Sequence, residues 1–259
     1  MGLRRSSQFD LPAAGRAASS PSLRLIPDLS AWPGAARRDP SPFSANWLIR
    51  EPLAAWLRAQ ARELAAFAPL RILDVGCGVK PYDPFFAEIA TTYVGVDAVD
   101  NPAAELGGLV ERLPVDDASF DLVICTQVLE HCGDPARAVS ELRRVTAPGG
   151  RVLASTHGIQ VYHPSPTDYY RWTHDGLRLL FERNARWSSL TVTPAGGTAA
   201  ALAMLLGTYI EIALRRRAFS RWPVWLLNRL AVAAESRSSR LRDPLPGSLT
   251  PNLHVVAQP

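Results

Sequence analysis

The residues best suited to ligand chemistry lie in the segment RILDVGCGVKPYD, residues 71–83. An apolar run ends at Asp74, and Gly76 and Gly78 follow it. A strand, a glycine turn and a helix form a ligand platform, because glycine lets the backbone approach the ligand and the helix N-terminus offers unpaired N–H groups. Dinucleotide sites use a third glycine, and Pro81 occupies that position here. The turn therefore favours a ligand without a pyrophosphate.

A ligand that carries both an ammonium and a carboxylate suits this turn better. The carboxylate of Asp74 can attract the ammonium, directly or through water, while backbone N–H groups receive the carboxylate. Asp97 ends the next apolar run, and an acid at that place can accept hydrogen bonds from both hydroxyls of a ribose. An amino acid joined to a nucleoside is the chemical description of S-adenosylmethionine.

The same segment resembles motif I of the class I S-adenosylmethionine-dependent methyltransferases, and more closely their type 11 group. The resemblance continues in order through LDVGCGVKPY, YVGVD and ERLPVDDASFDLVICTQVLEHCGDPARAVSELRRVTAPGGRVLAST, within residues 73–156. The later YHPSPTDYYRWTHDGL also looks like a segment of bacterial members, often associated with glycan or envelope chemistry, which is an analogy only. The resemblance implies methyl transfer with S-adenosylmethionine as the cofactor.

The resemblance also implies which residues contact each part of the cofactor. The glycine turn would line the methionine part, and Asp97 would hold the ribose. Glu111 and Arg112 would lie near the adenine, and Thr126 and Gln127 would flank the methionyl group. The full set of expected cofactor residues is Asp74, Gly76, Cys77, Gly78, Asp97, Glu111, Arg112, Thr126 and Gln127.

Catalysis needs little beyond alignment, because methyl transfer from a sulfonium is a direct displacement. An oxygen or nitrogen acceptor can require a base, and His131 and His163 both follow strands whose ends should face the cofactor. For His131 a structural role at the start of a helix is the alternative. Asp168, Tyr169 and Arg171 crowd the second loop and are predicted to bind substrate, since Tyr and Arg suit sugars, phosphates and carboxylates.

Strands and helices alternate along the central part of the chain. Strands are expected at 71–75, 92–97, 120–126, 151–156, 188–195 and 252–258. Asp134 should cap one helix, with Pro135 at its first position, and Thr173 should cap another. The pattern, with the resemblance, predicts an α/β fold: a Rossmann-like, doubly wound, mostly parallel seven-stranded sheet with helices on both faces. A helical insertion separates its last two strands.

Four regions follow from this pattern. Residues 1–42 are rich in Pro, Ser, Arg and Ala without apolar periodicity, which predicts a mostly disordered tail. With the resemblance, residues 43–195 are expected to form the methyltransferase domain, and 196–249 an apolar helical insertion. Residues 250–259 supply a terminal strand that completes the domain.

The insertion has two interpretations. Residues 198–214 are strongly apolar, but their length and the charge of Glu211 argue against a membrane span. They can form a helical cap over the acceptor site. Alternatively, residues 198–234 contact a membrane surface, with Arg215 to Arg217, Trp222 and Trp225 near headgroups. Both interpretations favour a large or lipid-linked acceptor.

The composition excludes several partner classes. The net charge is +4, yet no basic stripe is interleaved with aromatic residues, so a nucleic-acid partner is not expected. The three cysteines form no CxxC pair, which predicts reduced thiols and no metal site. Asp10, Gly15 and Arg16 interrupt any secretory signal. We expect a cytoplasmic protein, peripheral at the inner membrane face if the insertion contacts lipid.

The sequence thus predicts an S-adenosylmethionine-dependent methyltransferase acting on an oxygen of a glycan, a lipid-linked or another small-molecule substrate. The alternative is a non-catalytic, membrane-associated scaffold that keeps the fold. It is favoured by the insertion and by Leu109, which stands where relatives often place an acid that accepts the adenine amino group. A nicotinamide-dependent oxidoreductase fits less well, because the third glycine is missing.

Overall fold

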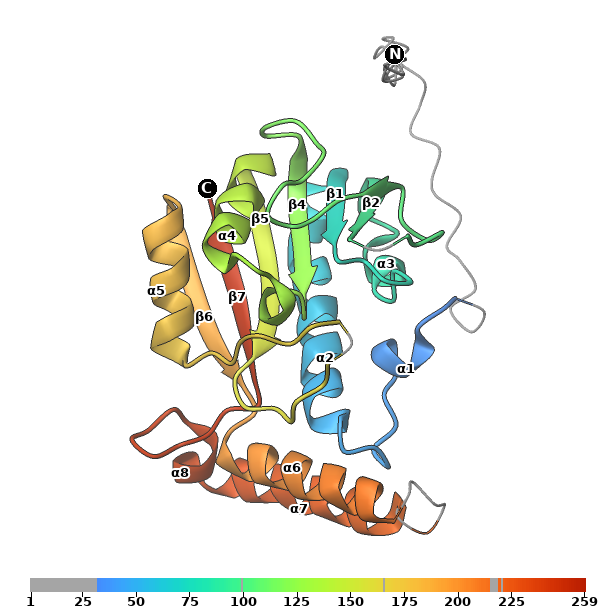
Figure 1. Ribbon diagram of the computed structural model, residues 1–259, viewed down its shortest axis with the longest axis vertical. Coiled ribbons are helices and arrows are strands. Elements are labelled where there is room, and N and C mark those ends of the chain that lie inside the picture. Colours follow the sequence, from blue (N-terminus) through green and yellow to red (C-terminus); the bar gives the residue numbers. More distant parts are fainter. Residues whose placement is uncertain (1–31, 99, 165, 215–218, 220) are drawn as a thin grey trace, which may run out of the picture.

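A mixed seven-stranded sheet with strand order β3-β2-β1-β4-β5-β7-β6 forms the centre of the computed structural model (Figure 1). The structure describes residues 32–259 except 99, 165, 215–218 and 220. The strands are β1 Leu70–Val75, β2 Ala90–Asp97, β3 Leu106–Gly107, β4 Phe120–Thr126, β5 Thr146–His157, β6 Ser189–Ala195 and β7 Asn252–Gln258. The α-helices are α1 Ala35–Arg38, α2 Trp47–Leu64, α3 Asp83–Phe86, α4 Pro135–Val145, α5 His174–Asn184, α6 Thr198–Ala213, α7 Arg221–Arg237 and α8 Ser239–Arg242. The short 3-10 helices are η1 Ala65–Phe67 and η2 Leu129–His131.

The inner strands are parallel and buried on both faces. β1 pairs in parallel with β2 and β4, and β4 pairs in parallel with β5. β7 runs antiparallel to both β5 and β6. Continuous apolar runs are expected in such strands, since helices cover both faces. The predicted fold class, with helices between the last two strands, is confirmed.

Two apolar layers hold the sheet between its helices. One layer joins α4 and α5 to the sheet through residues such as Leu142 and Phe181. The other joins α2 and α3 to the opposite face through Leu57 and Phe86. The buried apolar residues of α2 therefore pack on the sheet on the face opposite α4 and α5.

Side-chain caps start the two helices beside the site. Asp134 Oδ1 accepts a hydrogen bond of 3.0 Å from Arg137 N at the start of α4. Thr173 Oγ1 accepts one of 3.0 Å from Gly176 N at the start of α5. Both caps were predicted, and each satisfies an N–H group that the first turn of a helix leaves unpaired.

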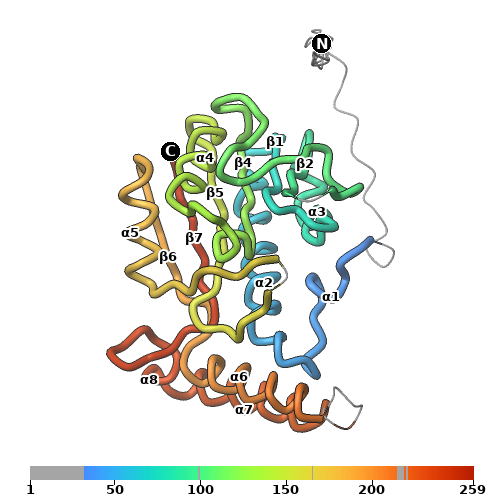
Figure 2. The backbone as a smooth tube through the Cα atoms, in the orientation of Figure 1, coloured from blue at the N-terminus to red at the C-terminus, as the bar shows by residue number. Residues whose placement is uncertain are grey.

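The parallel strands all run toward the same edge of the sheet. The turn after β1, the residues after β4 and the long loop 158–173 after β5 meet there (Figure 2). Ligands of open α/β sheets bind at this edge, where strand ends leave a crevice. The α6–α7 hairpin lies across the same end of the molecule (Figure 1).

The hairpin is held by polar contacts as well as by packing. Glu211 Oε1 accepts a hydrogen bond of 2.9 Å from Ala45 N. Glu235 Oε1 accepts hydrogen bonds from Gly197 N at 3.0 Å and Ala200 N at 2.7 Å, and so closes the start of α6. Within the described ranges, no helix combines the length and the apolar character needed to cross a membrane.

The predicted disordered tail, residues 1–42, is wrong for residues 32–42. Arg38 is 1% exposed, and its guanidinium donates hydrogen bonds to Trp32 O at 2.9 Å and Pro81 O at 3.1 Å. Trp32 Nε1 donates to Lys80 O at 3.0 Å. Arg38 therefore holds this segment against the residues after the glycine turn through hydrogen bonds to carbonyl groups, although the segment has no apolar periodicity. Residues 1–31 of the predicted tail lie outside the described residues.

The cap of α4 provides a test of this local structure. We expect Asp134→Ala to lower the free energy of unfolding by about 1 kcal/mol, because Arg137 N loses its acceptor. Urea unfolding followed by circular dichroism measures the change. Asp116→Ala, on an exposed loop, is the control and should leave stability nearly unchanged; equal effects of the two substitutions would contradict the assigned cap.

Candidate cofactor and acceptor site

The glycine turn after β1 needs both of its glycines, for different reasons. Gly76 has a φ of 68° and Gly78 a φ of 52°, a region that side chains rarely adopt. A Cβ on Gly76 would lie 2.4 Å from Val128 Cγ2, so this glycine lets the turn pack on the residues after β4. A Cβ on Gly78 would meet no atom within 4 Å, so the backbone there faces open space. That open cradle fits a ligand group that approaches the main chain.

Asp97 joins the end of β2 to this turn. Its Oδ2 accepts hydrogen bonds from Gly78 N at 3.0 Å and from Asn101 Nδ2 at 2.9 Å. Asn101 Nδ2 also donates to Gly78 O at 2.7 Å. The predicted ribose acid therefore lies beside the glycine turn and is half-buried. Asn101, which the sequence did not single out, braces the same corner.

Asp74 lies beneath the turn rather than at its surface. It is 3% exposed, and the hydroxyl of Tyr93 on β2 donates to its Oδ2 at 2.8 Å. Burial raises the pKa of Asp74 to about 7, against the hydrogen bond from Tyr93, which lowers it. A positive ligand group nearby would favour the ionised carboxylate. The predicted ammonium contact stays a prediction.

Cys77 lines the turn as a buried thiol. Burial, followed by the nearby Asp74 carboxyl, raises its pKa to about 12, so it stays protonated and is no nucleophile. Lys80, which the structure buries close by, forms an ion pair with Glu105. Glu105 Oε2 in turn accepts a hydrogen bond of 2.6 Å from Gly95 N. This pair closes the side of the turn that faces β2.

The predicted adenine residues lie on the loop before β4. Glu111 Oε1 accepts hydrogen bonds from Gly133 N at 2.9 Å and Asp134 N at 3.4 Å, which ties this loop to the start of α4. Arg112 is exposed, and its backbone N–H donates to Leu109 O at 3.0 Å. Leu109 is 57% exposed, so an apolar side chain stands at this rim.

The residues after β4 are positioned by its neighbours in the sheet. Thr126 is buried at the strand end, and Gln127 has a φ of 57°. Gln127 Nε2 donates hydrogen bonds to Ser155 Oγ at 2.9 Å and Asn252 Oδ1 at 3.0 Å. The amide of Gln127 therefore contacts both β5 and β7. The helix η2 follows directly after this turn.

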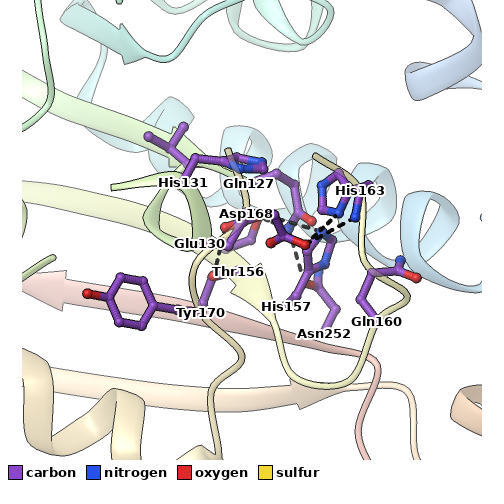
Figure 3. A network of polar contacts seen from close by, with 12 residues as sticks. Gln127, Glu130, His131, Thr156, His157, Gln160, His163, Asp168, Tyr170 and Asn252 are labelled. Atoms are coloured by element: carbon purple, nitrogen blue, oxygen red, sulfur yellow. Dashed lines mark hydrogen bonds and ion pairs between the residues drawn. The ribbon is translucent and has the colours of Figure 1, made fainter. Parts of the chain in front are cut away.

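Three histidines lie together beside this turn (Figure 3). The rings of His131 and His163 are 5.1 Å apart between centroids, and those of His157 and His163 are 5.4 Å apart. His131 Nδ1 lies 2.8 Å from Thr167 O. A carbonyl oxygen only accepts, so the proton is on Nδ1 and the lone pair of Nε2 is free. Burial lowers the pKa of His131 below its ordinary value, which favours the neutral ring.

The predicted substrate residues Asp168 and Arg171 bind each other. Arg171 Nη1 lies 2.5 Å from Asp168 Oδ1 and Nη2 lies 2.6 Å from Oδ2, and this pairing holds the pKa of Asp168 well below its usual range. Arg171 also donates to Val161 O at 3.0 Å, and His163 Nδ1 lies 3.3 Å from Asp168 Oδ2. The pair holds the loop in shape. Tyr169 is 58% exposed, and its expected contact with a substrate stays a prediction.

Glu130 and His157 are site residues that the sequence analysis missed. Glu130 is fully buried, and Thr156 Oγ1 donates to its Oε2 at 2.7 Å. His157 Nε2 lies 3.3 Å from Glu130 Oε1. Burial raises the pKa of Glu130 to about 7 and lowers that of His157 to about 3. The available signal was the position of Glu130 in the segment VLEHC, directly after two apolar residues. An acid that such a position buries needs polar partners.

A metal ion is a poorer occupant of this cluster. The ligand atoms of His131, His163 and Asp168 all lie within 4.8 Å of one another, as a metal site requires. However, both oxygens of Asp168 already accept hydrogen bonds from Arg171. A cation would have to sit beside that guanidinium, and like charges repel. The geometry favours proton chemistry.

The comparisons with known proteins cover the cofactor half of this site. A family model described as a methyltransferase domain matches residues 73–154. The malonyl-[acyl-carrier protein] O-methyltransferase of Erwinia billingiae is 32% identical over 120 residues, which make up 41% of this chain and 48% of that protein. A ubiquinone biosynthesis O-methyltransferase of Pseudomonas aeruginosa is 29% identical over 133 residues, or 46% of this chain and 52% of that protein.

The matched region, residues 73–154, is thus similar to a methyltransferase domain and contains the glycine turn and Asp97. The chain spans about half the length of the curated relatives it matches. Its fold is like that of a putative sarcosine dimethylglycine methyltransferase from Galdieria sulphuraria, with a TM-score of 0.51, 11% identity, and coverage of 81% of this chain and 86% of that one. The [4+2]-cyclase SpnF gives a TM-score of 0.50 at 16% identity, with coverage of 80% and 82%. Likenesses at this identity show the fold alone.

The methyltransferase match implies S-adenosylmethionine as the cofactor, and the site described above fits it. The open backbone at Gly78 leaves room for the methionine part, and Asp97 presents its carboxylate beside that space. Asp74 supplies a buried negative charge when it is ionised. The individual contacts expected from the sequence stay predictions at this point.

The raised pKa of Asp74 predicts a pH dependence of cofactor binding. Only the ionised carboxylate attracts an ammonium, and the carboxyl is mostly protonated below a pKa of about 7. Affinity for S-adenosylhomocysteine should therefore fall about tenfold from about pH 8 to about pH 6. Calorimetric titration at several pH values measures this.

Asp74→Asn should weaken binding and remove its pH dependence, because the amide does not titrate. Asp175→Asn, exposed on α5, is the matched control and should behave like the unaltered protein. Binding by Asp74→Asn that matches this control at every pH would contradict the assigned role.

Proposed function

We propose that this protein transfers a methyl group from S-adenosylmethionine to a hydroxyl oxygen of an acceptor, with His131 as the general base. The observation that carries the proposal is the contact of 2.8 Å between His131 Nδ1 and Thr167 O, which leaves Nε2 as the free basic atom. A hydroxyl must lose its proton as it attacks, so a neutral base at the strand edge suits an oxygen acceptor.

The chain itself mainly positions the reactants. The bound cofactor supplies a methyl group activated on its sulfonium. Gly76 and Gly78 give its methionine part access to the backbone, while Asp97 is placed for the ribose. His131 Nε2 takes the acceptor proton, and the loop 158–173 shields the reacting groups from water. The Asp168–Arg171 pair keeps this loop in the required shape.

The acceptor side carries exposed aromatic rings. Tyr162 and Tyr169 are 72% and 58% exposed on the loop beyond β5. Aromatic faces of this kind stack on sugar or apolar rings and offer a hydroxyl for hydrogen bonding. They support a glycan or a lipid-linked acceptor over a small ion. Two relatives named O-methyltransferases also support an oxygen acceptor.

The first experiment is a calorimetric titration with S-adenosylhomocysteine, with NADH as the control ligand. We expect binding in the micromolar range for the first and none for the second, because Pro81 replaces the third glycine that a pyrophosphate turn uses. Binding of NADH alone would instead support an oxidoreductase. Binding of neither would favour a scaffold that keeps only the fold.

The base is tested by His131→Asn. The rate of methyl transfer from tritium-labelled S-adenosylmethionine to a cell extract should fall by about 10²–10⁴-fold, while the affinity for S-adenosylhomocysteine stays unchanged. In the unaltered protein the rate should fall only below the ordinary histidine pKa, since burial lowers that of His131. His163→Asn is the comparison, and a larger loss there would assign the base to His163.

A further inference from the structure

The α6–α7 hairpin exposes two stripes of large apolar side chains. The stripe on α6 consists of Leu202, Leu206, Tyr209 and Ile212, which are 54%, 52%, 61% and 56% exposed. The stripe on α7 consists of Trp222, Leu226 and Leu230, which are 64%, 51% and 57% exposed. Spacings of three and four residues place each set on one helix face. Scattered apolar residues are normal on a surface, but a stripe on each of two helices that pack together indicates a binding surface.

The inward faces of these helices carry mostly small residues, with Met204 of α6 and Val224 of α7 as larger exceptions. Ala200 and Ala203 of α6 and Ala231 of α7 are buried in a cluster with Leu48 and Ile49 of α2. Gly207 packs on Ala45, where a Cβ would lie 3.2 Å from the Ala45 Cβ. A surface helix ordinarily turns its large apolar residues toward the core. Here many of them point outward, so folding of this chain does not account for the stripes.

The hairpin region is also the positive part of the protein. Residues 196–249 contain eight arginines and three acidic residues, a net charge of +5, whereas the remainder of the chain has a net charge of −1. Glu211 and Glu235 accept backbone hydrogen bonds within the fold, and Asp243 pairs with Arg242. On α7, Arg221, Arg229 and Arg237 are exposed. The outer surface therefore combines apolar stripes with positive charge.

An aromatic cluster lies at the start of α7. Trp222 meets Phe43 edge-on at 5.3 Å between centroids, and Trp225 stacks on Phe43 at 6.2 Å. Arg221 lies 5.4 Å from the centre of the Phe43 ring. Tryptophan and arginine together are typical of the boundary between lipid headgroups and acyl chains.

The positive charge of the hairpin region favours lipid over a second copy of the chain as the partner of this surface. A two-fold symmetric dimer through this face would bring the arginines of one hairpin near those of the other. An anionic lipid surface instead supplies the opposite charge and accepts the apolar stripes. We propose that the α6–α7 hairpin docks on an anionic membrane surface, lying along it rather than crossing it.

Docking would bring the strand edge close to the lipid. The hairpin lies across the end of the molecule toward which the parallel strands run, beside the loop 158–173 (Figures 1 and 2). Ile159 N of that loop donates to Thr250 O, just beyond the hairpin region, at 2.8 Å. The methyl acceptor is then a molecule carried by the membrane, and this second part rests on the methyl-transfer function proposed above.

The test of docking is flotation of the full chain with lipid vesicles. One vesicle is phosphatidylcholine with phosphatidylglycerol, and the other is phosphatidylcholine alone. The unaltered protein should float with the anionic vesicle and bind the neutral one more weakly. The double substitution Leu226→Ser with Leu230→Ser should reduce binding by about tenfold or more. Arg229→Gln with Arg237→Gln should reduce the preference for anionic lipid, because the net charge of residues 196–249 falls from +5 to +3.

Matched controls lie on α5, away from the hairpin. Leu179→Ser removes a side chain that is 43% exposed, and Arg183→Gln removes an exposed positive charge. Both should float like the unaltered protein. Calorimetric titration with S-adenosylhomocysteine checks that each variant keeps its fold, since the substituted residues lie outside the cofactor site.

Three outcomes would overturn part or all of the proposal. If the hairpin variants and the α5 controls float equally, the hairpin surface has no role in docking. A protein that ignores vesicles but forms a dimer in analytical ultracentrifugation, lost in Leu226→Ser with Leu230→Ser, would make the face an interface between copies. Docking combined with methyl transfer only to water-soluble molecules would leave the surface intact and overturn the lipid-borne acceptor.

Discussion

Burial of Glu130 is the constraint on which the acceptor side depends. Its carboxyl group accepts from Thr156 at the end of β5 and lies against His157. Its backbone oxygen accepts from Tyr169 N at 2.8 Å, so the same residue fixes the loop beyond β5. His131 follows it directly on η2. A buried carboxyl group is costly without partners, and its partners here are the segments that shape the site.

The family model covers the cofactor half of the site but not the acceptor half. The family model ends at residue 154, so it includes the glycine turn, Asp97 and the end of β4. His163, the Asp168–Arg171 pair and the α6–α7 hairpin all lie beyond that boundary. The family match therefore covers the residues expected to bind the cofactor, whereas the loop and the insertion proposed to select an acceptor lie outside it.

The sequence predicted most of the sheet because its strands are continuous apolar runs between clear turn and cap residues. β3 was missed because two residues carry no period, and the packing of residues 32–42 was missed because Arg38 binds carbonyl groups far along the chain. The candidate histidines were found from their positions after strands. Glu130, His157 and Asn101 were not, since their partners come from other strands and loops and only folding brings them together.

The short segment 32–45 has a consequence beyond its own packing. At one end Trp32 and Arg38 bind the carbonyl groups of Lys80 and Pro81, directly after the glycine turn. At the other end Asn228 of α7 donates to Pro42 O at 2.8 Å and Ser44 O at 2.9 Å. One strap of chain thus links the turn to the hairpin. If a ligand at the turn changes the free energy of contacts between the strap and the hairpin, then a partner bound at the hairpin changes the affinity for that ligand by the same free energy.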